Sequence, residues 1–154
     1  MDARIEQFID EMVQRYKDDQ MFFASYMMGK EGLTPIEMLM LLSFHERQGT
    51  NLKISKQVAI GNYRVDFVVE FLSQGEWFRA VIECDGHDFH EKTKEQAEHD
   101  KQRDRFLQGQ GYRVLRFTGR EIWRDPVKCR REVIEILMED ARKKRMGENL
   151  NGLD

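Results

Sequence analysis

Hydrophobic positions in the first third of the chain recur at helical spacing. Apolar residues from Ile5 to Tyr16 follow this spacing and predict an amphipathic helix within residues 1–28. After a glycine-containing linker at 29–32, Thr34 at an N-cap, Pro35 at the first helical position and Glu37 at the third predict a second helix, to about residue 48. The body of this helix is apolar on nearly every side, so we expect it to be buried, with Glu37 entering the core at its first turn.

Alternating and β-rich segments then predict three strands, at residues 52–60, 63–71 and 77–85. Gly61 and Asn62 have the composition of a two-residue hairpin turn between the first two strands. Alternation along the second strand predicts that Tyr63, Val65, Phe67, Val69 and Phe71 share one face and that Asp66 lies on the other. The segment is therefore predicted to form antiparallel hairpins.

Helical spacing returns in the last third of the chain. Thr93 and Gln96 form a capping-box pattern for a helix to about Gly109, whose inward stripe is mostly polar. The strand predicted at 112–117 follows a helical crossover, which favours parallel pairing with an earlier strand. Residues 120–123 are predicted as a short turn, Pro126 as the start of the last helix, and the residues from 143 onward as a frayed tail.

Acidic side chains occur where two of the predicted strands should be buried. Asp66 lies inside an apolar strand, where an unpartnered carboxylate would be costly to bury. Glu83 and Asp85 project from the same face of the third strand, and Gly86 lets the chain turn after them. Neighbouring carboxylates repel unless a positive charge lies between them, so the pattern suggests a divalent cation. A polar turn closing a hairpin is the alternative interpretation of the segment from Val81 to His90.

Length and composition indicate a single domain without a membrane role. The chain has 154 residues, of which 40% are hydrophobic and 34% charged, and its longest apolar run is too short to span a bilayer. The N-terminus lacks a signal-peptide pattern, so we expect a cytoplasmic protein. Cys84 and Cys129 are too few for a disulfide framework or a cysteine-based zinc site, and we expect both to be free thiols.

Charge is divided unevenly along the chain. The net charge is −3, but the segment from Lys101 to Arg145 has 14 Lys and Arg residues against 7 Asp and Glu, a formal +7 that leaves −10 for the remainder. An enzyme acting on a phosphate backbone could use such a division, with cations binding the polyanion and carboxylates binding metal. Solvated helical faces of mixed charge are the alternative.

The order of elements and acids resembles the PD-(D/E)XK nuclease superfamily, and more narrowly the very-short-patch-repair (Vsr-like) endonucleases. The resemblance covers residues 34–137. It rests on Glu37, on Asp66 within Val65-Asp66-Phe67, on Val81-Ile82-Glu83-Cys84-Asp85-Gly86, on His90, on Asp100 with Arg103, and on Gly111-Tyr112-Arg113-Val114-Leu115-Arg116-Phe117. It implies an α+β (α/β) fold with a restriction-endonuclease-like core, a central mixed four-stranded sheet flanked by helices in the order αβββαβα.

The resemblance also implies a metal-dependent DNA endonuclease, which cleaves or nicks double-stranded DNA with Mg²⁺ or, as a substitute, Mn²⁺. The implied catalytic residues are Glu37, Asp66, Glu83, Asp85 and His90. The implied metal ligands are Asp66, Glu83, the backbone carbonyl of Cys84, and Glu37 directly or through water. The expected nucleic-acid contacts are Lys101, Arg103, Arg116 and Arg120.

Asp85 departs from the family pattern, because this position is lysine in much of the superfamily and histidine in Vsr-like members. Either Asp85 is an additional ligand or base, or the cationic role has moved to His90, Lys101 or Arg103. His90, with an unperturbed pKa of about 6.5, is our first choice for proton transfer.

Structural alternatives exist for several of these residues. Glu37 could act only as a helix cap, and Asp100 with Arg103 could form an ion pair that holds their helix to the sheet. At the level of function, the alternatives are an inactive nucleic-acid-binding or assembly module on the same fold and an RNA-cleaving, toxin-like nuclease. The expected organisation is a helical extension at 1–30, the nuclease domain at 31–142 and a disordered tail at 143–154.

Overall fold

The computed structural model describes residues 32–44, 49–85 and 93–151, together with seven isolated positions among the first 14 residues, which are helical. Its elements are α3 (Pro35–Ser43), β1 (Leu52–Ile60), β2 (Tyr63–Ser73), β3 (Glu76–Asp85), α4 (Lys94–Gly109), β4 (Tyr112–Thr118), α5 (Gly119–Arg124) and α6 (Pro126–Asn151). The first predicted helix, residues 45–48 at the end of the second, and the segment 86–92 with His90 lie outside or largely outside the described residues.

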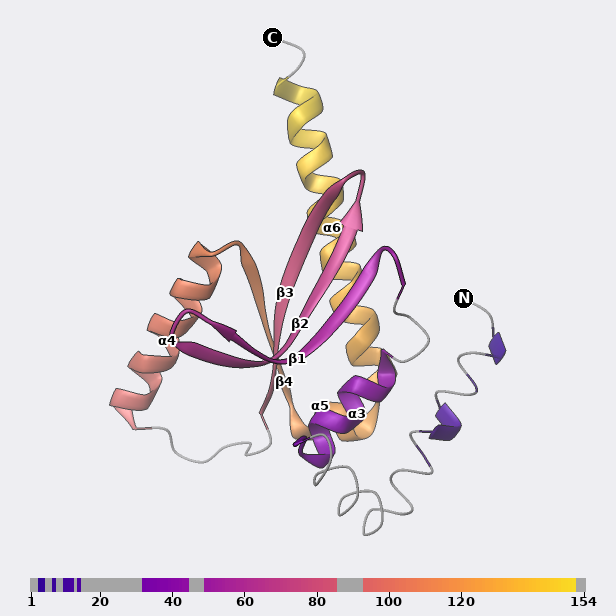
Figure 1. Cartoon of the computed structure of the whole chain (residues 1–154), viewed down its shortest axis with the longest axis vertical. Helices are drawn as coiled ribbons and strands as arrows, with labels where there is room; N and C mark the ends of the chain where they lie inside the picture. Colours follow the sequence, from indigo (N-terminus) through magenta and orange to yellow (C-terminus); the bar gives the residue numbers. More distant parts are fainter. Residues whose placement is uncertain are drawn as a thin grey trace.

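The four strands form one mixed sheet in the order β1-β2-β3-β4. Pairing is antiparallel between β1 and β2 and between β2 and β3, and parallel between β3 and β4. Parallel pairing requires a crossover connection, which α4 provides between β3 and β4. Figure 1 shows α4 on one side of the sheet and α3, α5 and α6 on the other. The predicted α+β fold with a restriction-endonuclease-like core is confirmed, and none of the described helices is long and apolar enough to cross a membrane.

Helix starts follow the side-chain caps that the sequence predicts. Thr34 and Glu37 form a complete capping box at α3, and Thr93 and Gln96 form another at α4. Each Thr side chain accepts an otherwise unpaired backbone N–H of the first turn, so both helices begin where the sequence predicts.

Two boundaries near the C-terminus differ from the prediction. The segment predicted as a turn at 120–123 is the helix α5, because Thr118 and Glu121 form a third capping box. The same Thr-x-x-Glu spacing was present in the sequence and could have indicated this helix. In addition, α6 continues to Asn151 through the predicted frayed tail, and Lys144 there makes an ion pair with Glu76 at the start of β3.

Two parts of β2 direct their apolar side chains to opposite faces of the sheet, which differs from the prediction. Phe67 and Val69 pack on the α3 and α6 side, but Val65 packs with Val68 and Leu107 on the α4 side. The prediction that Val65 shares a face with Phe67 is therefore wrong. Gln57 of β1 has a φ of 51°, and Gln57 and Asp66 opposite it are left out of the β1–β2 pairs, so the ladder is interrupted between Val65 and Phe67.

The hairpin tip is held against α4. Tyr63 makes ring contacts with His99 and Phe106, and a Cβ at Gly61 would lie 2.6 Å from the Phe106 ring. Gly61 also has a φ of 59°, so glycine is required here both by backbone conformation and by the close ring. This contact holds the start of β2, the strand that carries Asp66, against α4.

Candidate active site

The candidate site lies where β2 and β3 separate. The last paired residues of these strands are Phe67 and Ile82, and Asp66 comes next on β2. Its carboxylate Oδ2 accepts the backbone N–H of Cys84 at 2.8 Å, so a side chain takes the place of the ladder hydrogen bond. The carboxylate of Asp66 is thereby oriented by the backbone of β3.

Glu37 reaches the same region from the first turn of α3. Its carboxylate accepts the backbone N–H of Thr34 at 3.2 Å, and the residue is only 7% exposed. Burial raises the pKa of Glu37, and the nearby negative charge of Asp66 adds to this effect. The capping role is confirmed, and the cap leaves Glu37 within electrostatic reach of Asp66.

Glu83 is the third member of this acid cluster, by which we mean Glu37, Asp66 and Glu83. The pKa of Glu83 is raised to about 7: burial contributes most, the charge and a side-chain hydrogen bond of Asp66 add to the rise, and Arg103 opposes it. Two carboxylates this close cannot both hold a full charge at low cost. The cluster therefore favours a bound proton or cation.

Arg103 of α4 supplies a positive charge to the cluster. Its guanidinium donates to the Glu83 carboxylate and to the backbone carbonyl of Arg64 at 3.1 Å. The structure places Arg103 against Glu83, and its predicted ion pair with Asp100 and its predicted phosphate contact stay predictions. Of the three cations suggested as replacements for the missing lysine, Arg103 contacts an acid of the cluster, Lys101 is exposed on α4, and His90 is outside the described residues.

Asp85 lies on the same side of the sheet as Glu83, as predicted, but contacts a different group. Its carboxylate is 3.8 Å from Arg116 of β4, and Arg116 also donates to Asp104 of α4 at 2.8 Å. Burial lowers the pKa of Arg116, but its hydrogen bond and charge interaction with Asp104 outweigh burial and raise it. Asp85 and Arg116 thus belong to a second, more exposed charge network beside the acid cluster.

The remaining predicted residues have simpler positions. Arg120 is exposed on α5, so its predicted contact with nucleic acid stays open as a prediction. Cys84 meets Asp66 through its N–H, and the role of its carbonyl as a ligand also stays a prediction. The Cys84 side chain packs against the apolar core, where burial raises the pKa of the thiol, so it remains protonated at neutral pH.

Oxygen ligands of this kind suit a hard divalent cation. Among the described residues, however, no three His, Cys, Asp or Glu side chains converge as they would around a metal ion. Arg103 occupies one carboxylate of the cluster in this arrangement. The donor chemistry fits Mg²⁺, and binding would require the cluster to close around the ion.

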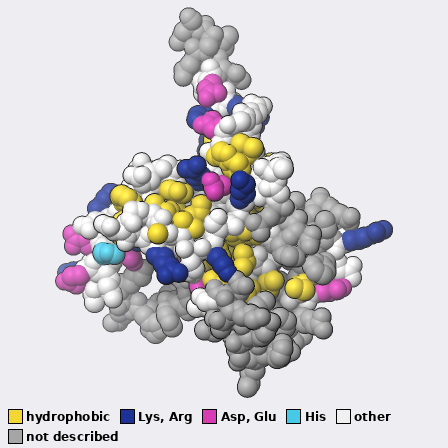
Figure 2. All heavy atoms as spheres, in the orientation of Figure 1, with side chains coloured by type: hydrophobic (Ala, Val, Ile, Leu, Met, Phe, Trp, Pro, Cys, Tyr) yellow, Lys and Arg dark blue, Asp and Glu magenta, His cyan; other side chains and the backbone are white. Residues whose placement is uncertain are grey.

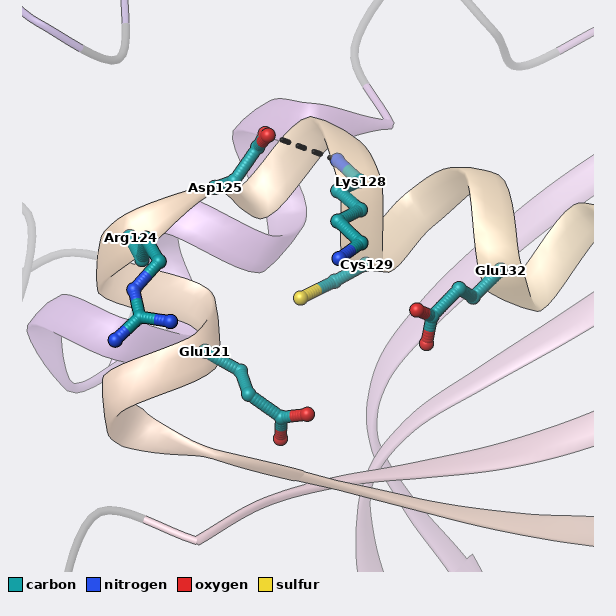
Figure 3. A pocket seen from close by; sticks show the side chains of 6 residues that line it. All are labelled: Glu121, Arg124, Asp125, Lys128, Cys129 and Glu132. Atoms are coloured by element: carbon teal, nitrogen blue, oxygen red, sulfur yellow. Dashed lines mark hydrogen bonds between the residues drawn. The ribbon is translucent and has the colours of Figure 1, made fainter.

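A pocket of about 160 Å³ lies away from the acid cluster, between α5 and α6 (Figure 3). It is lined by Glu121, Arg124, Asp125, Lys128, Cys129 and Glu132. Glu121 caps α5, and Asp125 accepts the backbone N–H of Lys128, so these acids already stabilise helix starts. Burial raises the pKa of Cys129 to about 12, which excludes a reactive thiolate at neutral pH. Two of the acids that line the pocket, Glu121 and Asp125, thus act as caps at the junction of α5 and α6.

Among the described residues on the face drawn in Figure 2, Lys and Arg side chains do not gather in a single patch. Hydrophobic side chains gather across the middle of this face, over the sheet, and Lys and Arg side chains are scattered around them.

Comparison with known proteins identifies related sequences. The sequence model of the REase_MTES_1575 family matches residues 44–137, which include Asp66, Glu83 and Arg103. An uncharacterized protein of Haemophilus influenzae is 31% identical over 93 residues, covering 60% of this chain and 53% of that protein. The chain thus spans about half the length of this curated relative. No solved structure gives a significant match.

Proposed function

Because the chain belongs to the restriction-endonuclease-like family REase_MTES_1575, we propose that it is a metal-dependent DNA endonuclease of the Vsr-like type. Membership in this family supports hydrolysis of phosphodiester bonds in a nucleic acid. The choice of DNA goes further and rests on the resemblance to Vsr-like endonucleases, and the metal requirement rests on the acid cluster. The proposed reaction is cleavage or nicking of double-stranded DNA.

The observation that supports the proposal is the electrostatic interaction of Glu37 and of Glu83 with Asp66. These residues come from α3, β2 and β3, and the pKa values of Glu37 and Glu83 are raised by burial and, in addition, by the charge of Asp66. Roles in stabilising the fold account for only part of this arrangement. A helix cap at Glu37 needs no second acid nearby, and the sheet needs no aspartate where β2 and β3 separate. Buried acids that perturb one another in this way are typical of functional sites.

Asp66, Glu83, the carbonyl of Cys84 and Glu37 are the groups that would hold Mg²⁺. A bound ion would stabilise charge on the phosphate and lower the pKa of a water molecule. The protein's own part is to orient the ligands: the N–H of Cys84 fixes Asp66, and the N-terminus of α3 fixes Glu37. His90 remains our candidate for proton transfer.

A nicking assay on supercoiled plasmid tests the proposal. Wild-type protein should nick DNA with Mg²⁺ or Mn²⁺ and lose this activity in EDTA. Asp66→Ala should lower the rate by about 100-fold or more, the size of effect seen when a group that stabilises transition-state charge is removed. Asp140→Asn is a matched control, because Asp140 is a carboxylate on α6 that pairs with Arg113. Cleavage that persists in EDTA, or equal rates for wild type and Asp66→Ala, would contradict the proposal.

A second function is favoured by the Arg103–Glu83 pair. An acid cluster in which a guanidinium already pairs with one carboxylate suits a nucleic-acid-binding or assembly module without turnover. In that case the wild type would not cleave plasmid but would shift DNA in a gel, more weakly as salt rises. An RNA substrate tested under the same conditions separates an RNA-cleaving enzyme from both.

A further inference from the structure

Arg103 is much more buried than the arginines of the surface ion pairs. Its side chain is 12% exposed and that of Glu83 is 10% exposed. In comparison, Arg79, which pairs with Glu70, is 45% exposed, and Arg113, which pairs with Asp140, is 54% exposed. Ordering a long cationic side chain at this depth is unfavourable unless its charge is needed there.

The charge is needed because Glu83 lies beside Asp66 in a buried setting. As a whole residue Glu83 is 7% exposed, the carboxylate of Asp66 is held by the backbone of the next residue, Cys84, and the guanidinium of Arg103 contacts the Glu83 carboxylate. A divalent cation bound between the acids would satisfy the same carboxylate. Arg103 and such an ion therefore act on Glu83 in the same electrostatic sense.

The guanidinium is held by the strand that carries Asp66 as well as by Glu83. It donates to the carbonyl of Arg64, two residues before Asp66 on β2. Arg103 thereby joins α4 to both acid-bearing strands, β2 and β3. A side chain with these anchors holds Glu83 and the strand of Asp66 to the same helix.

Resting on the proposed metal-dependent function, we propose that Arg103 is a positioning residue that takes the place of the cation in the metal-free site and competes with it for Glu83. The guanidinium keeps Glu83 aligned and compensated until a divalent ion binds. Removal of Arg103 therefore weakens the metal-free protein and strengthens its affinity for the ion, since the buried Glu83 beside Asp66 then lacks a counter-charge. A purely structural ion pair would weaken the protein and leave metal affinity unchanged or reduced.

Mn²⁺ is the probe for the test, with binding followed by calorimetric titration and by the midpoint of thermal unfolding, Tm, in EDTA and in excess Mn²⁺. For Arg103→Gln we expect a lower Tm in EDTA, a larger Mn²⁺-induced rise in Tm than in wild type, and a Kd for Mn²⁺ about tenfold lower, a difference of about 1.4 kcal/mol. Arg103→Lys keeps the charge and should stay within about threefold of the wild-type Kd. Arg105→Gln is the matched control, because Arg105 is exposed on the same helix, and it should behave as wild type.

Each other outcome overturns the inference. A Kd for Arg103→Gln equal to or weaker than that of wild type shows that Arg103 does not compete with the ion. An Arg103→Gln protein that is unfolded both with and without Mn²⁺ shows that the ion cannot replace the guanidinium. These results leave the proposed function intact if wild type binds Mn²⁺ and nicks DNA, whereas a wild type that binds no Mn²⁺ contradicts the proposed function itself.

Discussion

The two faces of the sheet differ in what holds them to their helices. On the α3 and α6 side, a large apolar cluster runs from Leu39 of α3 through Phe67 and Ile82 of the sheet to Leu137 of α6. On the α4 side, the buried cluster contains Val65, Val68, Val81 and Leu107 and gives way to charged contacts. Apolar burial thus dominates one face, while the other combines a small core with ion pairs (Figure 1).

This difference indicates a division of labour between the faces. The face packed on α6 supplies most of the buried apolar area, which makes it the main source of stability. The α4 face holds Glu83 with Arg103, and Asp85 with Arg116 and Asp104, at a cost in desolvation. Polar contacts of this kind are expected where a site has to exchange partners, and three predictions test the division.

The largest effect is expected from shortening a core leucine on each face. Leu137 and Leu107 are both fully buried, and either change to Ala should lower the free energy of unfolding by roughly 2–5 kcal/mol. Only Leu107→Ala should also change the Mn²⁺-induced rise in Tm, because α4 carries Arg103. Urea unfolding and thermal unfolding with and without Mn²⁺ measure both quantities. Equal changes in the metal response of the two variants would contradict the division between the faces.

The next effect is a pH dependence that arises from Glu83. Folding raises the pKa of this carboxyl from 4.5 to about 7, so the native state binds the proton more tightly than the unfolded state. Stability of the metal-free protein should therefore fall as pH rises through this interval, by up to roughly 3 kcal/mol, and level off above pH 7.

Glu83→Gln should flatten this decline when the free energy of unfolding is measured in EDTA across the same pH range. Glu70→Gln provides the control, because Glu70 belongs to the surface pair with Arg79 and should leave the slope as it is in wild type. An unchanged slope in Glu83→Gln would show that Glu83 is not the titrating group.

The smallest effect separates two equivalent helix caps. Thr34→Ala and Thr93→Ala each remove the side-chain oxygen of a capping box and should each destabilise the protein by about 1 kcal/mol. Only Thr34→Ala disturbs the first turn that holds Glu37, so only this variant should weaken Mn²⁺ binding. Calorimetric titration of both variants checks the comparison, and parallel losses would argue against a role for Glu37 in the site.

Much of the fold could be predicted from the chain because its signals are local. The four strands and the starts of α3, α4 and α6 follow from alternation, capping boxes and Pro126, each within a few residues of the observed boundary. The start of α5 had the same local signal at Thr118. The face of Val65 could not be predicted in this way, because the β1–β2 ladder is interrupted at Gln57 and Asp66, and this break has no signal in the alternation of β2 itself.

For the site, the sequence by itself determined which chemical groups are present and on which elements they lie. Glu37 at a capped helix start, Asp66 in an apolar strand and Glu83 with Asp85 on one face all follow from spacing, and their acidity suggested a cation. Only the tertiary structure decided that Glu37, Asp66 and Glu83 interact, that Arg103 compensates Glu83, and that Asp85 turns to Arg116. The physical reason is distance along the chain: local periodicity sets the face on which a side chain lies, whereas the partner it meets there depends on how separate strands and helices pack.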